Sequence, residues 1–147
     1  TKPGARRIVS MMRVLADPEL TSEQRLAFDR AVDQFNRGRY FDCHESLEGM
    51  WLGLRGPSRD FFQALIQVSV GLLHLERGNH TGATRTFTRA LSRFEPYPAR
   101  YFGFDLAAER ERLKTVLSAL TDESAAAPNP RPRWRFQPGE GQPRGRV

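Results

Sequence analysis

The sequence His44-Glu45-Ser46-Leu47-Glu48-Gly49-Met50-Trp51 places ionisable side chains among large apolar ones. At the 100° rotation per residue of an α-helix, His44 and Glu48 fall between two apolar arcs of this segment. A charged side chain inside an apolar face is costly unless it is paired, hydrogen-bonded or bound to an ion. The segment therefore predicts a helix that carries the functional residues of the chain.

Glycine, proline and capping residues on either side of this segment divide the chain into six predicted helices. Thr21 and Gln24 form a reciprocal capping pattern, and Gly38 supplies the left-handed residue that commonly ends a helix. Ser58 and Asp105 are the predicted caps of two later helices. Four of the predicted helices cover about 6–16, 41–54, 59–77 and 81–94. The second helix runs from a cap at Thr21 or Ser22 to Gly38, the last follows the Asp105 cap up to about Leu120, and no segment is a convincing strand. The predicted fold is all-α, a compact bundle of about six antiparallel helices built from helix-turn-helix pairs.

The predicted helix over 59–77 is apolar nearly all round, which is typical of a helix packed on several sides. Its polar side chains Gln63, Gln67 and His74 fall in one narrow stripe. Since such a stripe needs water or another polar stripe, we expect it to converge with His44 and Glu48. The predicted polar cluster, with Glu45 and Trp51 at its edge, is His44, Glu45, Glu48, Trp51, Gln63, Gln67 and His74.

Three interpretations of this polar cluster remain open. It is a buried network that fixes the register of the helices, a pocket for a small molecule or anion between helices, or a metal site. In the last case His44, Glu48 and His74 supply ligands that suit zinc or another divalent ion, and Glu45 acts as a general base. The metalloprotease pattern, however, needs a second histidine where this chain has Glu48.

Other features of the sequence carry weaker functional signals. Cys43 lies on the apolar arc and is expected to be a small core residue. Arg85, Arg89 and Arg93 recur every four residues, which is more typical of a solvated face than of a phosphate-binding one. The net charge of +6 over 147 residues is dispersed, so nucleic acid is not an expected partner.

Composition separates a helical domain over residues 1–120 from a tail over 121–147 that is rich in proline, arginine and glycine. Trp134 and Phe136 are unusual for a solvated tail, and we expect this part to be held against the domain or a neighbour. One cysteine and the lack of an apolar run of about 18 residues predict a cytoplasmic location without membrane insertion.

A faint internal repeat relates the two halves of the domain. Arg37-Gly38-Arg39-Tyr40 and Arg77-Gly78-Asn79-His80 are offset by 40 residues, and each precedes a predicted helix. Solenoids normally require at least three copies of such a unit. The repeat therefore favours paired antiparallel helices over a solenoid.

Two motifs together resemble a known family. The first runs from Gly38 to Glu48, and the second from Gln63 through His74 to Ala83. In this order and spacing they resemble the domain of unknown function 309 family of bacteria and archaea, over about residues 28–113. The resemblance implies a compact all-helical cytoplasmic domain and no established activity. Its signature positions correspond to His44, Glu45, Glu48, Trp51, Gln67, His74, Gly78, Asn79, Gly82 and Ala83.

The leading hypothesis is a helical module that binds a small ligand or a protein partner through the polar cluster, without chemistry and without a cofactor of its own. A homo-oligomer is compatible with such a module. The alternative is a metal-dependent hydrolase that uses His44, Glu45, Glu48 and His74.

Overall fold

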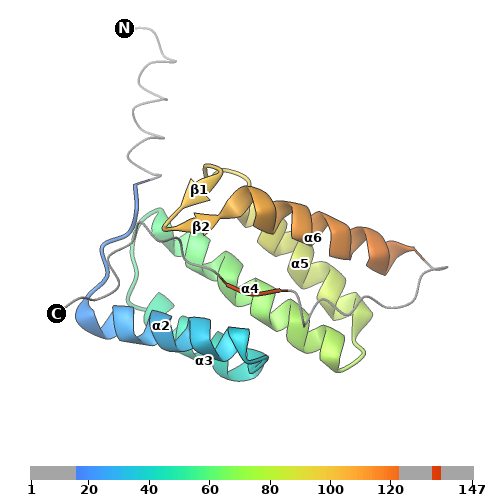
Figure 1. The fold of residues 1–147 in the computed structure, drawn as a ribbon, viewed down its shortest axis with the longest axis horizontal. Helices are drawn as coiled ribbons and strands as arrows, with labels where there is room; N and C mark the ends of the chain where they lie inside the picture. Colours follow the sequence, from blue (N-terminus) through green and yellow to red (C-terminus); the bar gives the residue numbers. More distant parts are fainter. Residues whose placement is uncertain (1–15, 123–133, 137–147) are drawn as a thin grey trace, which may run out of the picture.

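The computed structural model describes residues 16–122 and 134–136. Within them the chain forms five helices and one short hairpin (Figure 1): α2 (Ser22–Asn36), α3 (Tyr40–Trp51), α4 (Ser58–Glu76), α5 (His80–Phe94), β1 (Arg100–Tyr101), β2 (Phe104–Asp105) and α6 (Leu106–Thr121). The mostly helical fold agrees with the all-α prediction. The helix predicted for about 6–16 falls on residues outside this description, apart from Ala16, which lies in a bend.

The expectation that the chain contains no strand is wrong. Strands β1 and β2 pair antiparallel with Tyr101 opposite Phe104. The two residues that join them, Phe102 and Gly103, have φ of 49° and 78°. Positive φ at both central residues is the geometry of a type I′ hairpin turn. Strands of two residues are too short to show the alternation that marks a strand in a sequence, which explains the missed hairpin.

Two of the three predicted helix caps are confirmed. The Thr21 hydroxyl accepts a hydrogen bond from the Gln24 backbone N–H, and the Gln24 side-chain oxygen accepts one from the Thr21 backbone N–H, so the capping box of α2 is complete. The Asp105 side chain accepts from the backbone of Ala108 at the start of α6. Ser58, by contrast, does not cap α4. It is the first helical residue, and Pro57 precedes it without a side-chain cap. A proline next to the helix start fixes a helical φ and needs no capping partner.

The internal repeat corresponds to two turns with the same hydrogen bonds. In the α2–α3 turn, Arg39 N–H donates to the Gln34 carbonyl at 2.8 Å. Forty residues later Asn79 N–H donates to the His74 carbonyl, also at 2.8 Å. The central glycine of each turn has φ near the left-handed region, 76° at Gly38 and 72° at Gly78. The pairs α2–α3 and α4–α5 are thus two copies of one helix-turn-helix unit.

Helix α4 is the centre of the fold. It packs against α3 on one side and α5 on the other, while α2 packs on α3 and α6 on α5. No residue from Phe61 to Leu75 is exposed, as the all-round apolar pattern predicts. The α4–α5 contact is close at Gly71, where a Cβ would lie 2.4 Å from the Phe87 ring. Any side chain at this position would force the Phe87 ring or the helix that carries it to move.

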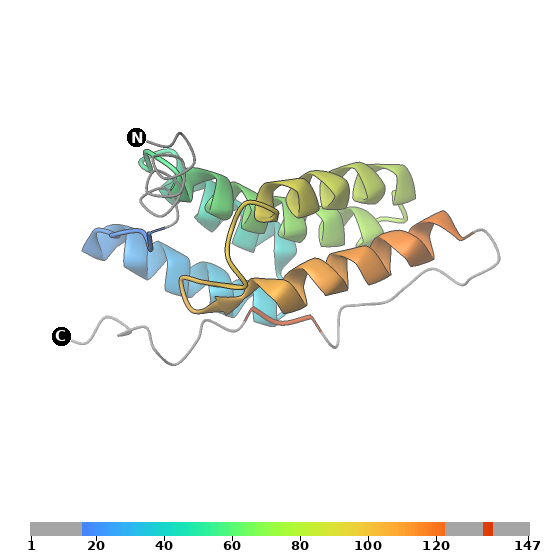
Figure 2. The ribbon, with the colours of Figure 1, turned by 90° about the horizontal axis from the view of Figure 1, so that it is seen from above.

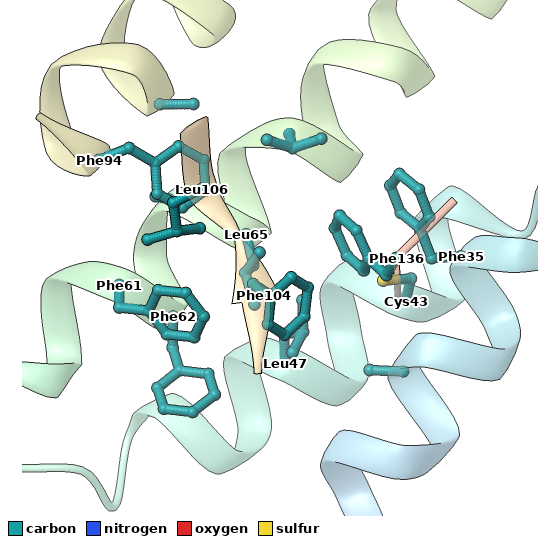
Figure 3. Close-up of a cluster of buried hydrophobic side chains, with 14 of the residues drawn as sticks. Phe35, Cys43, Leu47, Phe61, Phe62, Leu65, Phe94, Phe104, Leu106 and Phe136 are labelled. Carbon is teal, nitrogen blue, oxygen red and sulfur yellow. The ribbon is translucent and has the colours of Figure 1, made fainter. Parts of the chain in front are cut away.

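The core is unusually aromatic and includes residues far apart in the sequence (Figure 3). The hairpin adds Phe104, whose ring lies 5.5 Å from that of Phe61 in an edge-on contact. Phe28 of α2 contacts Phe62, Phe102 and Phe104. Aromatic pairs in this geometry add to the stabilisation from burial alone. The hairpin therefore closes one end of the helical core. In the part of the chain that the structure describes, none of the helices has the length and apolar character needed to cross a membrane.

Candidate functional site

Two residues of the predicted polar cluster, His44 and Glu48, meet at the edge of α3. The His44 Nε2 lies 3.1 Å from Glu48 Oε2, and His44 Nδ1 lies 2.8 Å from the Phe41 carbonyl. Because a carbonyl only accepts hydrogen bonds, Nδ1 carries a proton in this contact. The Glu48 side chain is 54% exposed. The pair therefore lies at the rim of the helix and not inside the core.

His74 and Gln67 of α4 have other surroundings. The amide of Asn79 lies 3.2 Å from His74 Nδ1, at the turn into α5. Gln67 Oε1 is buried, and no hydrogen bond reaches it from the described residues. Across residues 16–122 and 134–136, no hydrogen bond or ion pair joins either side chain to His44 or Glu48.

The metal site of the alternative hypothesis is not assembled. Among the described residues, no three or more His, Cys, Asp and Glu side chains come close enough to hold one ion. His44 and Glu48 lie on the rim of α3, whereas His74 is held by Asn79 at the end of α4. The hydrogen bonds of His74 and of the His44–Glu48 pair are thus made within separate groups of the described residues.

The other members of the predicted cluster are separate from it. Trp51 donates its indole N–H to the Arg59 carbonyl at 3.1 Å, and the Arg59 guanidinium lies 3.9 Å above the ring. Glu45 is exposed and Gln63 is half-buried. Trp51 thus fixes the α3–α4 corner by a cation–π contact.

Cys43 is a core residue, as expected. It is fully buried, and burial raises the pKa of its thiol to about 12. A thiol that stays protonated is a poor nucleophile and a poor metal ligand. Cys43 therefore has a packing role.

One pocket, with a volume of about 440 Å³, lies beside the start of α2 and the α3–α4 connection. Its lining includes Asp17, Gln24, Arg55 and Ser58, and none of the predicted cluster. The pocket is therefore separate from the residues that the sequence singled out.

The residues of the tail that the structure describes, 134–136, are bound to the domain. Trp134 and Phe136 are 1% and 2% exposed, whereas Arg135 between them is exposed. Alternate side chains of an extended segment point to opposite sides. The segment therefore presents both aromatic rings to the domain and its arginine to solvent. It lies between the end of α2, where Asn36 binds it, and the first turns of α6, where Glu109 binds it (Figure 2).

Phe136 is held by the end of α2. Its ring stacks on Phe35 with centroids 3.6 Å apart and planes inclined by 7° (Figure 3), and its edge meets Phe104. The Asn36 side chain accepts from the Phe136 backbone N–H at 2.8 Å and donates to the Phe136 carbonyl at 3.0 Å. One amide side chain thus satisfies both backbone polar groups of a single residue, as a neighbouring strand would.

Trp134 is held by α5 and α6. Its indole N–H donates to Glu109 Oε2 at 2.9 Å, in a fully buried contact. Its ring stacks on Phe87 at 5.7 Å, and the Arg112 guanidinium lies 5.6 Å from its centroid. Together with the contacts of Phe136 this defines a docking site, made of Phe35, Asn36, Phe87, Phe104 and Glu109.

Glu109 is the most perturbed carboxyl in the described residues. It is 7% exposed, and burial raises its pKa to about 7. The hydrogen bond from Trp134 and the charge of Arg112 act in the opposite direction, while the nearby Asp105 adds to the rise. A buried carboxyl with one donor is costly to ionise, so its state depends on whether Trp134 is present.

The docking site was missed in the sequence, although two signals pointed to it. Glu109 occupies a position of the apolar stripe Leu106, Leu113 and Val116, at the spacing of a buried helix face. Trp134 and Phe136 are two residues apart, the spacing of one face of an extended segment. Asn36 gave no signal, because an asparagine at a helix end is common for other reasons.

Comparison with known families identifies the central part of the chain. Residues 28–86 match the model of a family described as Domain of unknown function (DUF309). This match supports the resemblance to the family that the two sequence motifs indicate. The DUF309 match begins within α2, ends within α5, and contains Phe35 and Asn36 of the docking site. Trp134 and Phe136 lie beyond it. Among curated proteins, no match to the chain was found.

Proposed function

We propose that the DUF309 domain, completed by the hairpin and α6, is a binding module for an extended peptide with aromatic residues at alternate positions, without chemistry of its own. The observation that carries this proposal is the double hydrogen bond between Asn36 and the Phe136 backbone. Main-chain pairing supplies affinity, and pockets for alternate side chains supply specificity, when an extended peptide adds to a protein surface.

The aromatic contacts support the same proposal. Aromatic side chains bury roughly 150–250 Å² each and dominate the energetics of many interfaces. Trp134 and Phe136 are the two such anchors of this segment, and each contacts an aromatic ring of the domain. Arg135, between the two anchors, is exposed, so the site does not select the residue at this position. The site thus has the two-anchor form of a short-motif binder.

Part of the docking site lies within the family match, but its occupant does not. Phe35 and Asn36 are inside the DUF309 match, whereas residues 134–136 are outside it. A tail bound in the same chain has a high effective concentration, which excludes weaker partners. The partner proposed here is therefore a peptide with the chemistry of the tail, which replaces the tail when it is more abundant or binds more tightly.

The test uses the full chain with Trp134→Ala and Phe136→Ala, which removes both anchors of the tail. A fluorescent peptide with the sequence of residues 132–138, PRWRFQP, is expected to bind this variant with saturable anisotropy. It is also expected to raise the melting temperature of the variant with peptide concentration, by mass action. The wild-type chain is expected to bind the peptide at least about 10-fold more weakly, because its own tail competes.

The matched control peptide is PRWFRQP, which has the same composition but places the two aromatic residues next to each other. Such neighbours point to opposite sides of an extended segment, so this peptide should not bind. Equal binding of the two peptides would contradict the proposal. Phe136→Leu serves as a milder variant if the double substitution prevents folding, since it keeps most of the buried volume.

The buried Gln67 Oε1 supports a second candidate, a small-ligand site on the polar face of α4. An acceptor without a partner costs about 1–3 kcal/mol, which a ligand with a donor group would recover. In the free protein we expect Gln67→Met to raise stability by about 1 kcal/mol in urea denaturation. Gln63→Met, at a half-buried neighbour, is the control and should change little. A loss of stability in Gln67→Met would mean that the oxygen already has a partner.

Two further expectations belong to this proposal. We propose that the domain has six helices packed antiparallel. The two helix-turn-helix units, which share one turn geometry, support this arrangement. A cytoplasmic location would keep the single cysteine, Cys43, reduced.

A further inference from the structure

We infer that Glu109 makes the first position of the docking site selective for an indole, so that the preferred peptide is Trp-x-Phe and not any pair of aromatic residues. This inference rests on the proposed peptide-binding function. It assigns to Glu109 a specificity role that is independent of how tightly the Phe136 end is held.

The geometry distinguishes an indole from other aromatic rings. The Trp134 N–H is the side-chain donor that reaches Glu109, at 2.9 Å and in a buried contact. Phenylalanine has no donor and would leave the carboxyl group buried without a hydrogen bond. Sites built to hydrogen-bond a ligand group reject analogues that lack it, because the group of the site is then left unpaired.

The size of this effect can be stated as a ratio of affinities. A buried carboxyl group that is left without a hydrogen-bond partner, whether protonated or ionised, lowers affinity by about 10- to 100-fold. The Phe87 ring and the Arg112 guanidinium contact the ring face of Trp134 and also favour a large aromatic group. These face contacts do not depend on Glu109, so substitution of Glu109 separates the two effects.

The experiment compares two peptides on two proteins. The peptide PRWRFQP and its counterpart PRFRFQP are titrated onto the full chain carrying Trp134→Ala and Phe136→Ala, with Glu109 present or replaced by leucine. With Glu109 we expect the Trp peptide to bind about 10- to 100-fold more tightly. With Glu109→Leu we expect the ratio to fall below about 3-fold, because the apolar side chain no longer needs a donor.

The outcomes separate this inference from the proposed function. If neither peptide binds, both fail. If both peptides bind equally in the presence of Glu109, the inference fails and the peptide-binding function stands. If the preference for Trp persists in Glu109→Leu, the face contacts and not Glu109 determine it, which also overturns the inference.

A second measurement needs no added peptide and no vacated site. In the full chain, Trp134→Phe and Glu109→Leu are combined in a double-mutant cycle of urea denaturation. A coupling of at least about 10-fold in the unfolding equilibrium constant is expected, since the two groups share one buried hydrogen bond. Additive effects would overturn the assignment of the indole contact to Glu109.

Discussion

Phe136→Ala is expected to lower the free energy of unfolding by about 3–5 kcal/mol, the usual range for removing a buried phenylalanine side chain. The ring is 2% exposed, stacks on Phe35 and meets Phe104. Its loss opens a cavity between α2 and the hairpin, which the rigid aromatic neighbours cannot fill. Urea denaturation followed by circular dichroism measures the change.

The neighbouring residue provides a matched control for this first prediction. Arg135 is exposed between the two buried rings, so Arg135→Ala should change stability by less than about 0.5 kcal/mol. If both substitutions had the same small effect, residues 134–136 would not be held against the domain in solution. The docking site would then have no occupant in the free protein.

The stability of the fold is expected to depend on pH through Glu109. Its pKa is about 7 in the folded protein, against 4.5 for an exposed glutamate, because it is buried. The folded state therefore binds this proton more tightly than the unfolded state. The stabilisation from the protonated carboxyl is fully present below about pH 4.5 and is lost as the pH rises through about 7. Each pKa unit corresponds to 1.36 kcal/mol, so the loss is on the order of 3 kcal/mol.

Comparison with Glu109→Gln isolates this contribution from that of other titratable groups. The amide is neutral at every pH and its oxygen can still accept from the indole of Trp134. The difference in unfolding free energy between wild type and variant should thus shift in favour of the variant between pH 4.5 and pH 8. A difference that is constant over this range would show that Glu109 is not buried in solution.

The helices could be predicted because their signals are local. Thr21 and Gln24 mark the start of α2 by themselves, and Gly38 and Gly78 mark turns that only a left-handed residue makes easily. The apolar residues on all sides of α4 similarly predict its central position in the fold. The hairpin was missed because its conformation depends on contacts that are distant in sequence, those of Phe102 with α2 and of Phe104 with α4.

The candidate site could be predicted only in part, because helical periodicity gives positions on one helix but not the rotation of one helix against another. His44 and Glu48 share a helix and meet as expected. His74 depends on how α4 turns relative to α3, and it contacts Asn79 of the next turn. The docking site depends on contacts between residues as distant as Asn36 and Phe136, which periodicity does not report.

The Asn36–Phe136 contact has a consequence for synthesis of the chain, since it joins residues 100 positions apart. At ribosomal rates of roughly 5–20 residues per second, α2 waits about 5–20 s for the residue that covers Phe35. Over this interval the helix-turn-helix units can form from local contacts, but the apolar end of α2 stays open to chaperones and to other nascent chains. Messages truncated before the codon for Trp134 would prolong that exposure and should yield aggregated product.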